Sequence, residues 1–236
     1  MKKNEIEFDE EFKKYCQDIK IDNKIDITDQ NEWNELYITI KMKGWNQYQK
    51  IYELYKKYSK NKTQVKSSDL IELYKINIRV RNALYQCSLF IEEYIKSLLH
   101  YWKKDENEKL NNLMINELIK KIKSLNLETK ILKDINGSDF VMPKSKKTKD
   151  YYESWKDIRN ISCHRGLNVI LEIKNLKSHI ENMFCLLSNN INYQGSINNC
   201  CRLGFRDQFI KQFNKALSIK TEDETIKKII NHFTIK

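Results

Sequence analysis

The chain has 236 residues, a formal net charge of +11 and a pI near 9.2. This length is enough for one hydrophobic core, alone or with a small appendage, and the charge favours polyanionic partners such as a phosphate backbone. No 18-residue apolar run and no apolar segment near the N-terminus occur, so we expect a soluble cytoplasmic protein with no membrane partner. An AT-rich genome would also raise the lysine count, and that interpretation of the charge stays open.

One proline and five glycines are far below average usage, which favours long helices and few tight turns. The six cysteines have no C-x2-C spacing, so we expect reduced thiols. Neither a phosphate-binding glycine loop nor a metal-binding motif is present, and we expect no cofactor and no metal. We therefore predict an all-α protein.

The first 66 residues predict three helices, over 4–20, 30–42 and 45–59, and Gly44 interrupts the last two. The third helix carries Tyr48, Tyr52 and Tyr55 at positions i, i+4 and i+7. Tyrosines at this spacing, with lysines between them, suit either a base-stacking platform or core packing. We favour core packing.

The longest periodic segment runs over 70–103, without proline or glycine. As a helix it would span on the order of 50 Å. Arg79 and Arg81 place fixed positive charge on its polar side, and Glu92 lies close to its apolar stripe. We expect Glu92 to pair with an arginine or histidine of another helix, although a solvated glutamate fits the pattern equally well.

Two further helices are predicted over 110–125 and 128–136, the second closed by Gly137. The stretch 137–150 is the most loop-like in the chain, and it contains Lys144, Lys146, Lys147 and Lys149. Because this loop leads directly into the next helix, its lysines suit the guidance of a phosphate backbone. An exposed, solvated loop is the equally weighted alternative.

Residues 151–166 read YYESWKDIRNISCHRG. An apolar stripe at helical spacing predicts a helix that Gly166 can close, and its members are Tyr151, Trp155, Ile158 and Ser162. Beyond it, we predict helices over 167–187, 200–217 and 222–233, with a loop over 189–199 as the best candidate boundary. His179 is expected at the surface.

Arg159, Asn160 and His164 form the tightest grouping of reactive polar residues in the sequence. Histidine titrates near neutral pH and acts as acid or base, whereas arginine stays charged and forks onto two phosphate oxygens. Arg159 and His164 are five residues apart, or about 140° around a helix. They reach one target only if His164 lies in a frayed last turn or a second subunit contributes.

The R-N-x3-H pattern at the end of a helix resembles the signature of HEPN domains. The segment Ile78–Trp102, with its Ile91-Glu92 pair, resembles the first core helix of Abi-like (abortive-infection) members of that superfamily. The resemblance implies a HEPN-like helical bundle with extra N- and C-terminal helices. We therefore expect a core over 67–190, an N-terminal extension over 1–66 and a C-terminal extension over 191–236.

The resemblance also implies a metal-independent endoribonuclease and antiphage toxin that leaves 2′,3′-cyclic phosphate ends. His164 would be the acid or base, Arg159 would stabilise the transition state, and Asn160 would orient the site. Substrate-binding residues would be Lys144, Lys146, Lys147, Lys149 and Arg165, and supporting residues would be Glu92, Arg79 and Arg81. The expected partners are RNA, a second copy of the chain, and an antitoxin or regulatory RNA. A non-catalytic RNA-binding or regulatory subunit and a basic helical scaffold remain as alternatives.

Overall fold

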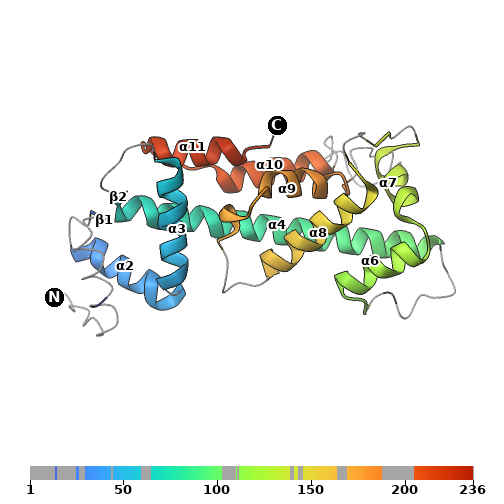
Figure 1. Cartoon of the computed structure of the whole chain (residues 1–236), viewed down its shortest axis with the longest axis horizontal. Helices are drawn as coiled ribbons and strands as arrows, with labels where there is room; N and C mark the ends of the chain where they lie inside the picture. Colours follow the sequence, from blue (N-terminus) through green and yellow to red (C-terminus); the bar gives the residue numbers. More distant parts are fainter. Residues whose placement is uncertain are drawn as a thin grey trace, which may run out of the picture. The chain divides into compact units, whose positions relative to one another are not determined.

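The structure is a computed structural model (Figure 1). It describes Lys14 and residues 25–26, 30–43, 45–59, 65–102, 110, 112–138, 141–142, 146–163, 169–187 and 205–235. These residues form an all-α fold, as the low glycine and proline content predicts. Within the described ranges, no helix is long and apolar enough to cross a membrane.

Contacts divide the chain into two compact units, and helix α4 (Ser67–Trp102) contributes to both. The first unit comprises residues 1–78, 166–172 and 218–234, and the second comprises residues 79–165, 173–217 and 235–236. The first unit thus combines segments from all three of the expected ranges 1–66, 67–190 and 191–236. Those ranges stay a prediction.

Among its described residues, the first unit contains the start of α4, further helices, a short 3-10 turn and a two-residue strand pair. Its elements are α2 (Gln30–Lys43), α3 (Trp45–Tyr58), α11 (Glu224–Phe233), η2 (Ile170–Glu172), β1 (Ile25–Asp26) and β2 (Val65–Lys66). The break between α2 and α3 falls at Gly44, as predicted. The parallel pairing of β1 with β2 was not predicted.

The tyrosine stripe of α3 packs into the core of the first unit. Tyr48 and Tyr55 are almost fully buried. The Tyr55 hydroxyl donates to Oδ2 of Asp223 at 2.7 Å, while Oδ1 of that aspartate caps α11 by accepting from the Ile226 amide. The preference for core packing over a base-stacking platform is therefore confirmed for these two rings.

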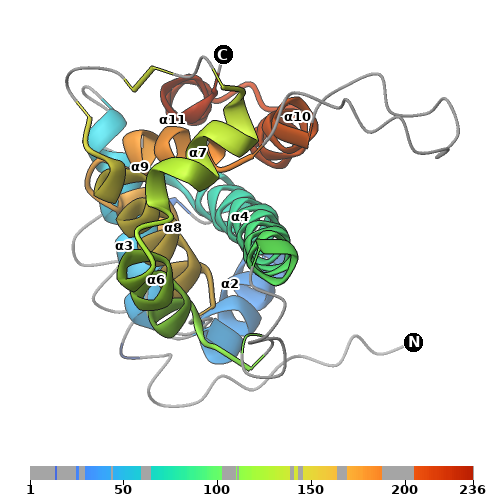
Figure 2. The ribbon, with the colours of Figure 1, turned by 90° about the vertical axis from the view of Figure 1, so that its right-hand side faces the viewer.

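The described part of the second unit contains the rest of α4 and several further helices (Figure 2). They are α6 (Ile115–Ser124), α7 (Glu128–Asn136), α8 (Thr148–Cys163), α9 (Leu176–Phe184) and α10 (Phe205–Leu217). Helix α8 packs against α6, α7 and α9. Phe90 of α4 contacts Phe205 and Phe209 of α10, with ring centroids 4.7 and 5.4 Å apart. The apolar stripe of α10 thus docks on the core.

Two helix predictions are wrong. The helix expected over 167–187 is broken into η2 and α9, with Asn175 in the left-handed region at φ 59°. The side chain of buried Asn77 explains the first piece, because its Oδ1 accepts from the Ile170 amide at 2.8 Å. The helix expected over 110–125 is interrupted, because residues 112–114 are not helical and α6 begins at Ile115, where Glu117 accepts from the extended Met114 amide at 3.0 Å.

Candidate functional site

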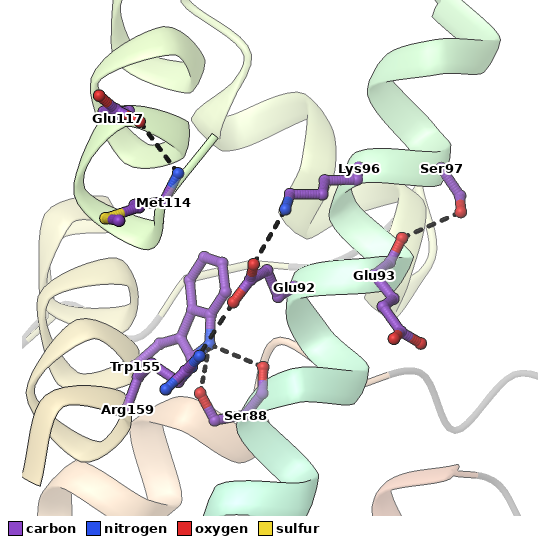
Figure 3. A network of polar contacts seen from close by, with 9 residues as sticks. All are labelled: Ser88, Glu92, Glu93, Lys96, Ser97, Met114, Glu117, Trp155 and Arg159. Atoms are coloured by element: carbon purple, nitrogen blue, oxygen red, sulfur yellow. Dashed lines mark hydrogen bonds and ion pairs between the residues drawn. The ribbon is translucent and has the colours of Figure 1, made fainter. Parts of the chain in front are cut away.

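One residue of the buried stripe of α8, Trp155, joins this helix to α4 in the second unit. All four predicted stripe residues are buried, namely Tyr151, Trp155, Ile158 and Ser162. The indole Nε1 of Trp155 donates to both Oγ and the backbone oxygen of Ser88, at 3.0 and 3.2 Å (Figure 3). This bond sets the rotation of α8, and the residue one turn later, Arg159, therefore faces α4 as well.

The guanidinium of Arg159 is held between two side chains of α4. Its Cζ lies 4.8 Å from the centroid of the Tyr85 ring, a cation–π contact. Its Nε lies 3.5 Å from Oε2 of Glu92 (Figure 3). Tyr85 and Glu92 are seven residues apart on α4 and share a face. The pairing of Glu92 with a cation of another helix, expected from the sequence, is present.

The Glu92 carboxylate is shared between two cations. Lys96, one turn later on α4, donates to Oε1 at 2.9 Å, which is closer than the approach of Arg159 to Oε2. The side chains of Glu92 and Lys96 are each 14% exposed, so water screens their interaction only in part. With all three groups ionised, two positive charges and one negative charge leave this cluster at +1.

The Arg159 side chain retains donors for a further anion. Tyr85 covers one side of the guanidinium and Glu92 occupies the Nε edge. Among the described residues, no hydrogen bond is formed by its two terminal amino groups, and the side chain is 19% exposed. These two groups match a pair of oxygens of a phosphate or carboxylate in bidentate geometry.

Asn160 follows Arg159 on α8 and is half-buried. The last residue of the helix is Cys163, which is exposed and reduced. His164, Arg165 and Lys144 lie outside the described residues. The role expected for His164, and its meeting with Arg159, therefore stay predictions.

The remaining loop lysines lie at the opposite end of α8 from Arg159. Lys146 donates to Oγ of Ser178 on α9 at 3.3 Å, whereas Lys147 and Lys149 are exposed. Lys149 precedes Arg159 by ten residues, which corresponds to about 15 Å along the helix. Lys149 and Arg159 are therefore close in the sequence but far apart along α8.

For the two expected supporting arginines, Arg79 and Arg81, no contact with Glu92 or Arg159 is found among the described residues. The Nε of Arg79 donates to the backbone oxygen of Ala216 at 3.2 Å, at the C-terminal end of α10. It precedes Glu92 by thirteen residues, or about 20 Å of helix. Arg81 is buried, one helical turn before Tyr85. Glu92 is thus the expected supporting residue that contacts Arg159.

Tyr85 and Lys96 are contacts that the sequence prediction missed. Their signal is spacing, because they lie seven residues before and four residues after Glu92 and so face the same way. His179, expected at the surface, is partly exposed. This side chain is 30% exposed, with its Nδ1 atom 4.0 Å from Oδ2 of Asp157.

Among the described residues, no three histidine, cysteine, aspartate or glutamate side chains form a group that could hold a metal ion. The cluster at Glu92 carries two cations against one carboxylate, a balance that would attract an anion. No family model matches the chain, and no match to it was found among curated proteins or solved structures.

Proposed function

We propose that the chain is a metal-independent endoribonuclease of the HEPN type, acting as an abortive-infection toxin, in which Arg159 binds the scissile phosphate. The observation that carries this proposal is the excess charge at Arg159. Because Lys96 already contacts the Glu92 carboxylate at 2.9 Å, Arg159 is not needed to neutralise it. A guanidinium held on two sides, with two donors left over, is pre-organised for an anion with paired oxygens.

The reaction needs no group beyond those in the chain and the RNA itself. The 2′-hydroxyl attacks the adjacent phosphorus, a 2′-oxygen–phosphorus bond forms, and the bond to the 5′-oxygen breaks. A base removes the proton of the 2′-hydroxyl, and an acid donates a proton to the leaving 5′-oxygen. The products are a 2′,3′-cyclic phosphate and a 5′-hydroxyl, with no water consumed.

In this proposal, His164 supplies the proton transfers and Arg159 stabilises the negative charge that grows on the phosphate oxygens. Asn160, beside Arg159 on α8, orients the substrate. On a regular helix the two motif residues would point about 140° apart, so in this proposal Arg159 of one copy and His164 of a second copy meet at one phosphate in a homodimer. The expression of the active protein would then be toxic through cleavage of cellular RNA.

The test is a cleavage assay on labelled RNA in EDTA with the wild type, Arg159→Ala and His164→Ala. We expect cyclic phosphate products from the wild type and a loss of about 10²- to 10⁴-fold in each variant. Equal activity in all three proteins would overturn the proposal. If the wild type binds RNA without cleaving it, and His164→Ala binds equally well, the non-catalytic RNA-binding alternative is correct.

A further inference from the structure

A row of cations follows the exposed side of α8 and ends at Arg159 and Asn160. At 100° per residue, Lys149, Lys156 and Asn160 lie within about 20° of one line along the helix, opposite the buried stripe. Arg159 falls on the edge between this line and the buried face. From α6, Lys123 reaches the same line, where its Nζ lies 3.2 Å from Oε1 of Glu153.

Glu153 is the one carboxylate on this line, and two lysines share it. Lys156 contacts Oε2 while Lys123 contacts Oε1. These contacts lower the pKa of Glu153, first through its hydrogen bond to Lys156, so the carboxylate remains ionised at neutral pH. Together with the cluster at Glu92, five cations (Lys96, Lys123, Lys149, Lys156 and Arg159) against two carboxylates (Glu92 and Glu153) leave a surplus of three positive charges.

The other two acidic residues of α8, Asp150 and Asp157, lie on its other edge. Asp150 accepts from the backbone amide of Lys147 at 2.7 Å, and Asp157 lies 4.0 Å from His179 of α9. The pKa of Lys156 is raised first by its hydrogen bond to Glu153, and Asp157 makes the smallest contribution. The positive charge is therefore concentrated on the side of α8 that carries Arg159.

We infer that this row is the binding track for the RNA strand, which we name the α8 track: Lys123, Lys149, Lys156, Arg159 and Asn160. The inference rests on the proposed function, because it makes RNA the ligand. Lys149 and Asn160 are about 16 Å apart along the helix, and a stacked strand advances about 3.4 Å per nucleotide. The substrate class is then an RNA strand of on the order of five nucleotides or more, rather than a mono- or dinucleotide.

The test measures the binding of 2′-O-methyl RNA, which lacks the nucleophile and so separates binding from cleavage. An octamer and a dinucleotide are titrated at several salt concentrations against the wild type, Lys149→Gln and Lys156→Gln. Lys211→Gln, an exposed lysine of α10, is the matched control. Lys149 is also exposed, so its replacement leaves the fold intact even if Lys156→Gln disturbs the contact with Glu153.

Each track variant is expected to bind the octamer up to about fivefold more weakly. The slope of log affinity against log salt should become shallower by about 0.7 for each lost phosphate contact. Dinucleotide binding and the Lys211→Gln variant should keep wild-type values. If the wild type cleaves RNA but both track variants keep the wild-type slope, the α8 track is wrong and the nuclease proposal stands. If the slopes change as expected but unmodified RNA is left intact, the α8 track stands and the nuclease proposal fails.

Discussion

The Nε atom of Arg159 lies 3.5 Å from Oε2 of Glu92, an oxygen of a carboxylate that also accepts from Lys96 at 2.9 Å. In a simple ion pair, Glu92 would cancel the charge of Arg159. The second cation prevents this, because one negative charge is divided between two positive ones. Glu92 can then orient the guanidinium while the cluster keeps an attraction for phosphate.

The first prediction separates orientation from charge at Glu92. Glu92→Gln raises the net charge of the cluster from +1 to +2, so RNA should bind slightly more tightly. Cleavage should slow by about tenfold or more, because Arg159 loses the ionic partner that positions it. Single-turnover rates on RNA and dissociation constants for 2′-O-methyl RNA measure the two effects. Glu93→Gln, an exposed neighbour on α4, is the control, and a wild-type cleavage rate in Glu92→Gln would contradict the positioning role.

The second prediction concerns Lys96. Lys96→Gln leaves Arg159 as the remaining cation of the cluster at Glu92, so its charge is neutralised and RNA affinity should fall up to about fivefold. In a Glu92→Gln background the same Lys96→Gln replacement should cost less affinity than in the wild type, because no carboxylate is left to neutralise Arg159. A double-mutant cycle on dissociation constants measures this coupling. Strictly additive effects would show that Lys96 does not act through Glu92.

The third prediction tests the bond that sets the rotation of α8. Trp155→Phe removes the indole donor from buried Ser88 and should lower the free energy of unfolding by about 1–3 kcal/mol. Trp155→Ala should cost about 3–5 kcal/mol, because it also leaves a cavity. Urea unfolding midpoints measure both values. Tyr101→Phe, at a side chain 75% exposed, should stay within about 0.5 kcal/mol of the wild type. A similarly small change for Trp155→Phe would contradict the role of the Ser88 bond.

The fourth prediction is a loss of stability at alkaline pH. Burial raises the pKa of the Cys87 thiol well above its ordinary value of 9.0, and burial also raises the pKa of Tyr152. Above about pH 9 the unfolded chain releases the thiol proton while the folded chain retains it, so the free energy of unfolding falls as the pH rises. Urea midpoints at pH 8 and pH 10 measure this fall. It should be smaller in Cys87→Ala and unchanged in Cys163→Ala, whose thiol is exposed; equal falls in both variants would refute the assignment to Cys87.

Long amphipathic helices with clear ends could be predicted from the sequence. Gly44 separates α2 from α3, Gly137 closes α7, and α4 follows its uninterrupted apolar period. The break before α9 could not be predicted, because it depends on Asn77, a residue of a distant helix that accepts from the Ile170 amide. The spacing of apolar residues indicates where a single helix forms, but it does not indicate contacts between segments that are far apart in the sequence.

The same limit applies to the candidate site. Arg159 was selected by a motif, and a partner for Glu92 on another helix was one of two equally supported interpretations of a charge beside an apolar stripe. The loop lysines were expected beside Arg159 because they precede its helix. They lie near the N-terminal end of α8, whereas Arg159 lies near its C-terminal end, and Lys146 contacts α9. Lys123 and Lys156 could not be assigned to the site from the sequence, because they come together only where α6 packs on α8 and both lysines contact Glu153.

The most direct test of the central claim uses a DNA oligonucleotide that contains a single ribonucleotide, incubated with the protein in EDTA. We predict one cut, at the phosphodiester on the 3′ side of that ribonucleotide, with a 2′,3′-cyclic phosphate and a 5′-hydroxyl as the new ends. Arg159→Lys, which keeps the charge but loses the fork, should cut at least about tenfold more slowly. Cleavage at other positions, cleavage of the all-DNA strand, or a 5′-phosphate end would contradict the account.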